Sequence, residues 1–161
     1  MRTLIAHVTV NSAGNAVVSS VVKRRTTFTV RFAGDYRYNA AARAVSPYVR
    51  AGVAVTLAGY YGKSGSTLLF HGTEPAETIS VAPARAAGSC FNTLVQAYLG
   101  NTWQFISSLT CGTLDATSRG YAQFGINRPL GVPVRIRASV PDDSATQTLG
   151  ATSAWVYLTF T

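Results

Sequence analysis

The feature that most constrains this chain is a two-residue period in its apolar side chains, repeated in short runs along nearly the whole sequence. In one such run Phe28, Val30 and Phe32 fall on one face of an extended chain, with Thr and Arg side chains on the other. Runs of this kind, bounded by turn-forming residues, predict strands at residues 4–10, 16–22, 26–32, 45–49, 53–61, 67–71, 78–81, 90–99, 102–111, 120–126, 132–140 and 153–160. The nearest helix candidate, residues 39–44, is short. The pattern predicts an all-β sandwich or barrel.

The composition agrees with a sheet protein that has a core. Hydrophobic residues make up 47% of the chain and charged residues 12%, so the polar surface must come mainly from uncharged side chains, which suits exposed sheets. The formal net charge is +8. Two explanations stay open: an anionic partner such as a glycan or cell-wall polymer, or a solvated surface rich in Arg. Because the Arg residues are spread along the chain, we expect no nucleic-acid partner.

The two cysteines, Cys90 and Cys111, are interpreted as a disulfide, with two buried free thiols as the alternative. A structural zinc site needs four ligands, and the two His residues are distant in sequence. If Gly100 and Asn101 form a two-residue hairpin turn, counting outward places Cys90 opposite Cys111 at a non-hydrogen-bonded position.

The same count gives two further pairs in this hairpin. Tyr98 is expected opposite Trp103, and Val95 is expected opposite Ile106. A turn of four residues would keep this register, so the expected pairs do not depend on the turn type.

A disulfide implies an oxidising compartment, so we expect a secreted or cell-surface protein. Residues 1–7 are too few and too polar for the apolar segment of a signal peptide, so we expect an export signal upstream of this chain or another export route. No apolar run approaches the length of a membrane span.

Residues 8–53 resemble the C-terminal half of a bacterial immunoglobulin-like repeat, of the kind found in tandem on secreted and surface proteins. The segments that carry the resemblance are a Gly-containing turn at 11–16, a Thr-rich strand at 26–35 with the corner Phe32-Ala33-Gly34-Asp35-Tyr36-Arg37-Tyr38, and residues 36–45. The later part is similar to a whole domain of this kind, on the segments 103–105, 134–138 and 153–157. The resemblance implies an immunoglobulin-like antiparallel β-sandwich with a partial domain at residues 1–50 and a complete one at 51–161.

The partial domain departs from the family because its opening strands are missing. An incomplete sandwich exposes core side chains and a sheet edge. Three explanations stay open: the chain is a fragment of a longer protein, the half-domain packs onto the second domain, or a partner donates the missing strands.

The residues that catalysis or metal binding would need are few. The six acids are Asp35, Glu74, Glu77, Asp115, Asp142 and Asp143. Glu74 and Glu77 are assigned to a loop, and neither they nor the adjacent Asp142 and Asp143 form the facing pair that a glycosidase needs. His7 and His71 have no nucleophile motif near them. We therefore expect no enzyme, no cofactor and no metal site, with Asp35 capping its turn rather than binding calcium.

Aromatic side chains are the remaining candidates for ligand binding. Tyr60 and Tyr61 are adjacent on a predicted strand, so one of them must point outward, and Tyr98 and Trp103 pair near a hairpin tip. Exposed aromatic surfaces bind sugars and protein partners. The alternative is a buried position in the core for Trp103, and more strongly for Trp155.

The resemblance implies a non-catalytic structural, adhesion or assembly module whose partners are other copies or neighbouring immunoglobulin-like domains. Two alternatives stay open. One is a module that binds carbohydrate or cell wall through Tyr60 and Tyr61 or through Tyr98 and Trp103. The other is a filament or virion subunit that self-assembles by strand complementation.

Overall fold

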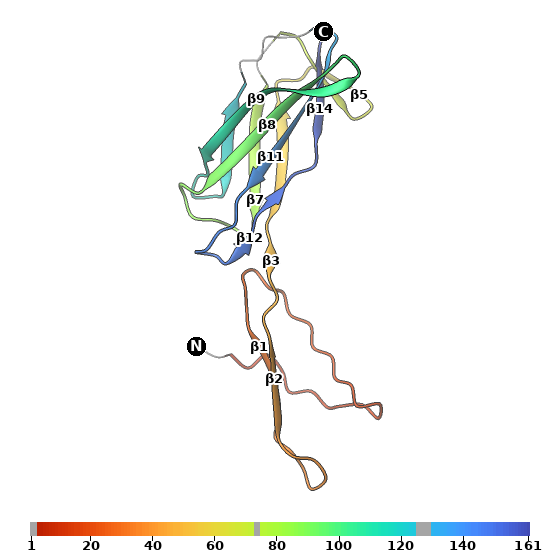
Figure 1. Ribbon diagram of the computed structural model, residues 1–161, viewed down its shortest axis with the longest axis vertical. Coiled ribbons are helices and arrows are strands. Elements are labelled where there is room, and N and C mark those ends of the chain that lie inside the picture. The colour runs from red at the N-terminus through yellow and green to blue at the C-terminus, as the bar shows by residue number, and fades with distance from the viewer. Residues whose placement is uncertain (1–2, 73–74, 125–129) are drawn as a thin grey trace.

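The computed structural model describes residues 3–72, 75–124 and 130–161. Figure 1 shows a sandwich of sheets and, below it, an N-terminal arm, the name used here for residues 3–48. The strands are β1 (Phe28–Phe32), β2 (Ala41–Val45), β3 (Val49–Arg50), β4 (Gly52–Ala58), β5 (Gly62–Ser64), β6 (Thr67–Phe70), β7 (Ala76–Ala82), β8 (Cys90–Leu99), β9 (Thr102–Thr113), β10 (Arg119–Gln123), β11 (Pro133–Val140), β12 (Thr148–Leu149), β13 (Ala151–Thr152) and β14 (Val156–Phe160). Within the described ranges, no helix is long and apolar enough to cross a membrane.

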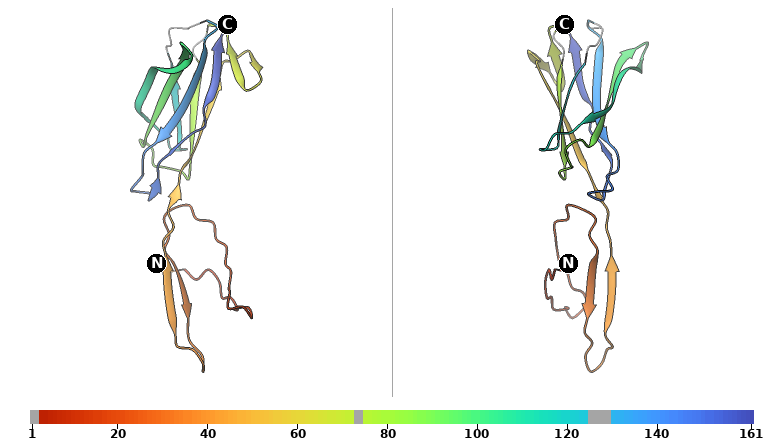
Figure 2. Two further views of the ribbon diagram at one scale, coloured as in Figure 1. Left: turned by 45° about the vertical axis from the view of Figure 1, so that its right-hand side comes forward. Right: turned by 90° about the vertical axis from the view of Figure 1, so that its left-hand side faces the viewer.

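Two sheets pack together in the sandwich, and the views in Figure 2 show both layers. The large sheet has the order β5-β6-β14-β11-β8-β9, with β13 also paired to β11, and the small sheet has the order β10-β7-β4. Buried and less buried side chains alternate along β7, β8 and β11, because one face of each strand meets the opposite sheet. The predicted all-β architecture is confirmed.

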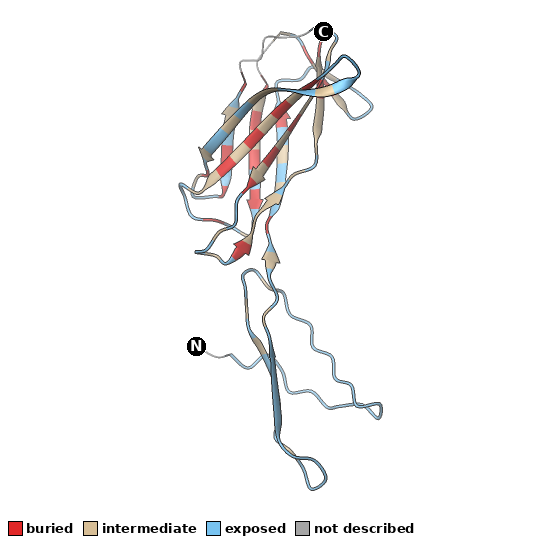
Figure 3. Ribbon diagram, viewed as in Figure 1, coloured by how far each residue is buried: buried red, intermediate tan, exposed pale blue. Residues whose placement is uncertain are grey.

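The core lies between the sheets in two clusters. The first consists of Leu57, Leu68, Phe70, Val95, Ala97, Phe124, Val134, Ile136, Leu158 and Phe160. The second consists of Ala51, Ile79, Val81, Phe91, Leu114, Ala138 and Val140. Every buried hydrophobic side chain of the described chain belongs to the sandwich, as Figure 3 shows by colour. The sandwich therefore contains its own core, and the arm contributes nothing to it.

The expectation of purely antiparallel pairing is wrong at two places. β14 runs parallel to β6, with Leu158 opposite Leu68, and β12 runs parallel to β3, with Thr148 opposite Val49. Parallel neighbours need long connections. Here the connections are long because β6 and β3 lie early in the sandwich sequence and their partners lie at its end.

The β8–β9 hairpin has the predicted register only near its turn. Tyr98 lies opposite Trp103, as predicted. A register shift then follows on the way to the open end, so Val95 lies opposite Ser107 rather than Ile106. Counting from the turn assumes that each residue has one partner. A bulge adds a residue to one strand without changing the apolar pattern of the other, so the count cannot reveal it.

The predicted disulfide between Cys90 and Cys111 is present, but the two residues do not lie opposite each other. A second register shift places Cys90 opposite Thr113. The Cα atoms of the two cysteines are 4.5 Å apart, and the backbone N–H of Cys111 donates to Asn92 Oδ1 at 2.9 Å. The Asn92 side chain thus satisfies a donor that the bulge leaves without a strand partner.

Removing this disulfide by changing both Cys90 and Cys111 to Ser is expected to lower the free energy of unfolding by roughly 2–3 kcal/mol. The bond closes a segment with a sequence separation of 21, and opening it enlarges the unfolded ensemble. Urea unfolding of the oxidised protein and the double variant measures the difference. An unchanged unfolding midpoint would contradict this role.

Two strands predicted in the arm are wrong, because residues 4–10 and 16–22 form none. The turn between them is present. Gly14 N–H donates to the Asn11 carbonyl, and Asn11 Oδ1 accepts the N–H groups of Ala13 and Asn15. An alternating sequence becomes a strand only when it pairs with another, and these two segments have no strand partner in the described chain.

Other departures are local. The helix candidate at 39–44 and the predicted strand at 45–49 give way to β2, which pairs with β1. The predicted strand at 26–32 is confirmed by β1. Predicted turns at 62–66 and 141–150 contain the short strands β5 and β12. β5 forms a short hairpin with the following strand β6, whereas β12 pairs with the distant β3, a neighbour that a local pattern does not encode.

Buried Arg85 holds together the end of the sandwich that faces the arm. Its guanidinium donates to the Pro141 carbonyl at 2.8 Å and to Thr148 Oγ1 at 3.4 Å, and its backbone N–H donates to Ser118 Oγ at 2.7 Å. Thr148 belongs to β12, which pairs with β3 at the start of the sandwich. Arg85 therefore connects the loop after β7 with the strands at the junction to the arm.

Candidate functional site

The outward side of the large sheet carries a cluster of aromatic and arginine side chains, which we call the aromatic–arginine face. It lies on the neighbouring strands β9, β8, β11 and β14, and on the residue just before β14. Its members are Tyr98, Trp103, Phe105, Arg135, Arg137, Trp155 and Tyr157. Val134 and Ile136 flank Arg135 on β11 and are fully buried, so Arg135 points away from the core.

Arg135 is the centre of this face. Its guanidinium carbon lies 4.2 Å from the ring centroid of Trp103 and 4.0 Å from that of Trp155. Its Nε and Nη2 donate to Gln96 Oε1 at 2.9 and 2.6 Å. A cation over an aromatic ring is attracted by about 1 kcal/mol, so these contacts fix the side chain in one position.

The other members extend the cluster on both sides of Arg135. Arg137 lies 4.4 Å from the centroid of the Trp155 ring. Trp103 lies 5.3 Å from Tyr98 and 6.0 Å from Tyr157, between ring centroids. Both tryptophans are half-buried on the outer side of the sheet, so the alternative of a core position for Trp103 and Trp155 is wrong.

The large sheet has an uncompensated positive charge. Its seven strands contain three cationic residues, Lys63, Arg135 and Arg137, and no Asp or Glu. The nearest polar partner of Arg135 is the neutral amide of Gln96. The aromatic–arginine face is therefore cationic as well as aromatic.

The second predicted pair, Tyr60 and Tyr61, lies near the C-terminus. Tyr60 packs edge-on against Phe70, with ring centroids 6.3 Å apart, and Tyr61 stacks on His71 at 3.6 Å. The Tyr61 hydroxyl shares a hydrogen bond of 2.8 Å with Thr161. These two rings pack against different neighbours.

Glu77 was expected in a loop, but it lies in β7 and points into the core. It is 1% exposed, and neither of its carboxylate oxygens has a hydrogen-bond partner among the described residues. Burial raises the pKa of this carboxyl to about 7. Glu74, its expected neighbour, lies outside the described residues. A carboxyl that is enclosed in this way cannot reach a substrate, so we assign Glu77 no role in chemistry; its effect is on stability, as the pH dependence discussed below shows.

The exposed acids are engaged in turns. Asp35 Oδ1 accepts two backbone N–H groups at 2.8 Å, which confirms that it caps its turn. Asp143 accepts a hydrogen bond from Thr146 Oγ1 at 2.7 Å, which lowers the pKa of its carboxyl. The described ranges contain no group of three metal-ligating side chains.

The N-terminal arm exposes most of the uncovered apolar side chains. Of the 20 large hydrophobic residues exposed in the described chain, 13 lie in the arm. The register pairs Phe28 with Val45, so Phe28, Val30, Phe32 and Val45 share one face of the β1–β2 hairpin. Phe28 is partly buried and Arg43 lies opposite Val30, but Val30 is 73% exposed and Val45 is 63% exposed, so most of this face is uncovered in the described chain.

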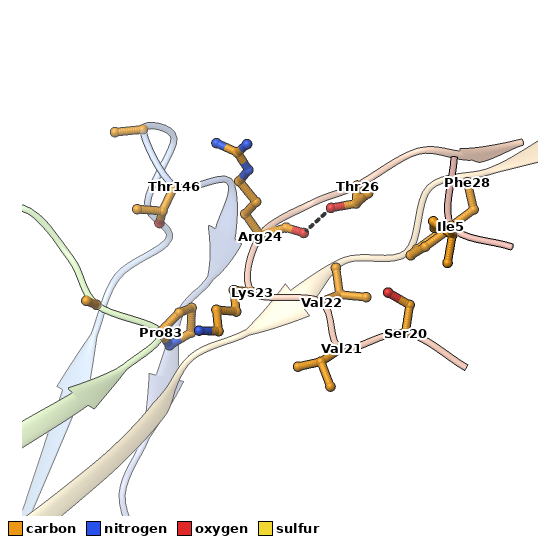
Figure 4. A pocket seen from close by; sticks show the side chains of 12 residues that line it. Ile5, Ser20, Val21, Val22, Lys23, Arg24, Thr26, Phe28, Pro83 and Thr146 are labelled. Carbon is orange, nitrogen blue, oxygen red and sulfur yellow. Dashed lines mark hydrogen bonds between the residues drawn. The ribbon is translucent and has the colours of Figure 1, made fainter. Parts of the chain in front are cut away.

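The arm meets the sandwich at an open cavity of about 580 Å³ (Figure 4). Val21, Val22 and Lys23 line it from the arm, and Pro83 and Thr146 line it from the sandwich. No carboxylate, imidazole or thiol lies among the described residues that line it. The lining contains one amine, Lys23, and a few hydroxyls with no base beside them, so we interpret the cavity as a junction between the arm and the sandwich.

The sequence interpretation missed Phe105, Arg135, Arg137 and Tyr157 as members of the aromatic–arginine face. A signal for the two Arg residues was present, since they alternate with inward apolar residues in the predicted strand at 132–140. The sequence could not show that β11 and β14 lie beside the β8–β9 hairpin, because strand order depends on contacts between segments far apart in the chain.

Comparison with known proteins finds no match for this chain among protein-family models, curated proteins or solved structures. The functional assignment therefore depends on the geometry described above.

Proposed function

We propose that this chain is a non-catalytic, immunoglobulin-like assembly module of a secreted or surface-assembled bacterial protein, and that strand pairing with a neighbouring copy completes its N-terminal arm. The observation that carries the proposal is the uncovered apolar face of the β1–β2 hairpin. A hairpin of two strands is marginally stable alone, and unpaired strand edges form templates for pairing with other chains.

The strand order supports the immunoglobulin-like assignment. In such sandwiches the strands A, B and E lie together in one sheet and C, F and G lie in the other. The small sheet places β4, β7 and β10 in the order expected for A, B and E, and the large sheet places β8, β11 and β14 in the order expected for C, F and G. The disulfide differs, because it links β8 to β9 within one sheet instead of joining the two sheets.

The energetics favour a covered arm. Full burial of one Val or Phe side chain contributes roughly 1.5–3 kcal/mol. Val30, Phe32 and Val45 are 73%, 41% and 63% exposed, so a partner that covered this face would gain several such contributions. The gain would add to the backbone hydrogen bonds formed along a free edge of β1 or β2.

The extracellular location and the non-catalytic role are supported by the disulfide and by the positions of the acids. The Cys90–Cys111 disulfide is compatible with an extracellular protein. The acids of the described chain are either buried without an opposing group or engaged in turns, which supports a non-catalytic role.

Light scattering over a concentration series tests the proposal. We expect the full chain to form species with masses that are multiples of 17.0 kDa, and we expect residues 48–161 to remain monomeric. Val30→Lys should weaken assembly because it places a second cation opposite Arg43 in the middle of this face. The matched control is Tyr121→Lys, at a 62% exposed position on β10, which should assemble normally. A full chain that is monomeric at every concentration would overturn the proposal.

A further inference from the structure

We propose that the aromatic–arginine face binds an acidic glycan, meaning a sugar chain whose rings carry carboxylate groups. This site lies on the large sheet and does not depend on the arm. The inference goes beyond the assembly role, and it stands whether or not the arm pairs with another copy.

The positive charge of the face favours an anionic ligand. The three cationic residues on the strands of the large sheet have no carboxylate on the same strands. Gln96 accepts from Nε and Nη2 of Arg135, and its guanidinium carbon lies 4.2 Å from the Trp103 ring and 4.0 Å from the Trp155 ring. Its other N–H groups donate to no acceptor in the described chain. A guanidinium edge of this kind matches a carboxylate by two parallel hydrogen bonds.

Exposed rings beside Arg135 supply surfaces for sugar rings. The register places Phe105 opposite Gln96 and Tyr98 opposite Trp103. Phe105 is 64% exposed and Tyr98 is 39% exposed, so both rings are open to solvent beside the cation. A sugar ring combines an apolar C–H face with polar edges. It can therefore cover an aromatic ring and present its acid group to the neighbouring guanidinium.

The arrangement of the cations favours a glycan over a nucleic acid. Arg135 and Arg137 are two residues apart on one strand, and both contact Trp155. A nucleic-acid backbone is bound by cations that follow a row of phosphates. Two cations that share one aromatic ring form a local anion site instead.

The face is also held in place before a ligand arrives. Arg135 makes two ring contacts and two hydrogen bonds in the free protein. Little side-chain entropy is left to lose on binding, which favours affinity.

Tryptophan fluorescence of the full chain tests the proposal. The chain has two tryptophans, and both lie on this face, so the emission reports on this site alone. The probes are trigalacturonate, neutral galactotriose, inorganic phosphate and oligo-dT. We expect a saturable emission change with trigalacturonate and binding at least roughly ten-fold weaker with each of the other three.

Two variants and a control locate the site. Arg135→Gln should weaken trigalacturonate binding by roughly ten-fold or more. Phe105→Ala should also weaken it, and its exposed position leaves the fold and the contacts of Arg135 intact. Arg119→Gln removes the same charge from the small sheet and should bind normally. Absence of a saturable change, an equal loss in Arg119→Gln, or an equal response to phosphate or oligo-dT would overturn the proposal.

Discussion

Replacing Phe91 with alanine is expected to lower the free energy of unfolding by roughly 3–5 kcal/mol, the range for a fully buried Phe. Phe91 is 0% exposed, and its ring lies against Gly112 of β9 and Gly120 of β10. The ring thus joins the large sheet to the small one. Because the two glycines have no side chains that could move into the cavity, we expect a loss near the upper end of this range. Urea unfolding at neutral pH measures it.

A second substitution, Gly120→Ala, tests this explanation, because its effect on stability should reverse sign when Phe91 is replaced by alanine. A Cβ atom on Gly120 would overlap the Phe91 ring, so Gly120→Ala should destabilise the native protein by roughly 1–3 kcal/mol. In the Phe91→Ala background the same change fills part of the cavity and should be stabilising. Gly52→Ala is the matched control, because its Cβ would meet only the Ala82 carbonyl oxygen at 3.7 Å. If the effects of Phe91→Ala and Gly120→Ala on the free energy of unfolding simply add, the explanation is contradicted.

Glu77→Gln is expected to stabilise the protein by about 3 kcal/mol at pH 8 and to change stability little at pH 4. Burial raises the pKa of the folded carboxyl from 4.5 to about 7. Below pH 4.5 the group is protonated in both the folded and the unfolded state, and no penalty arises. Between pH 4.5 and 7 only the unfolded state ionises, so stability falls as the pH rises. Above pH 7 the penalty is complete and constant.

Unfolding by urea at several pH values checks this prediction. The native protein should lose stability relative to Glu77→Gln across the window from pH 4.5 to 7. Asp115→Asn is the control: hydrogen bonds from Arg119 and Thr117 lower the pKa of this exposed carboxyl, so its effect should vary only in the acid range. Parallel stability curves for the native protein and Glu77→Gln would contradict the assignment of Glu77 as a buried, unpartnered acid.

Much of the strand content could be predicted, because alternation is a local signal. The residue ranges of β8 and β11 follow the predicted runs closely, and Tyr98 lies opposite Trp103 as counted from the turn. The disulfide was also predicted, since the two cysteines flank one hairpin. These features depend on residues that are near each other in sequence.

The features that were missed depend on distant neighbours. Residues 4–10 have a strand pattern but no strand to pair with. Trp155 alternates with apolar residues as a core residue would, yet it faces outward because β14, which follows it, packs its other side against the small sheet. Glu77 lies in the core because Leu57 and Ala122 flank it across the small sheet. Side-chain period alone does not determine which face of a strand is covered.

Hydrogen exchange of the full chain at low and high protein concentration tests the proposed assembly most directly. If neighbouring copies complete the arm, the backbone amides of β1 and β2 should become more protected as the concentration rises, while those of β8 and β11 stay equally protected throughout. Rapid exchange of the β1 and β2 amides at every concentration would contradict the account, because it would mean that no second copy pairs with the arm.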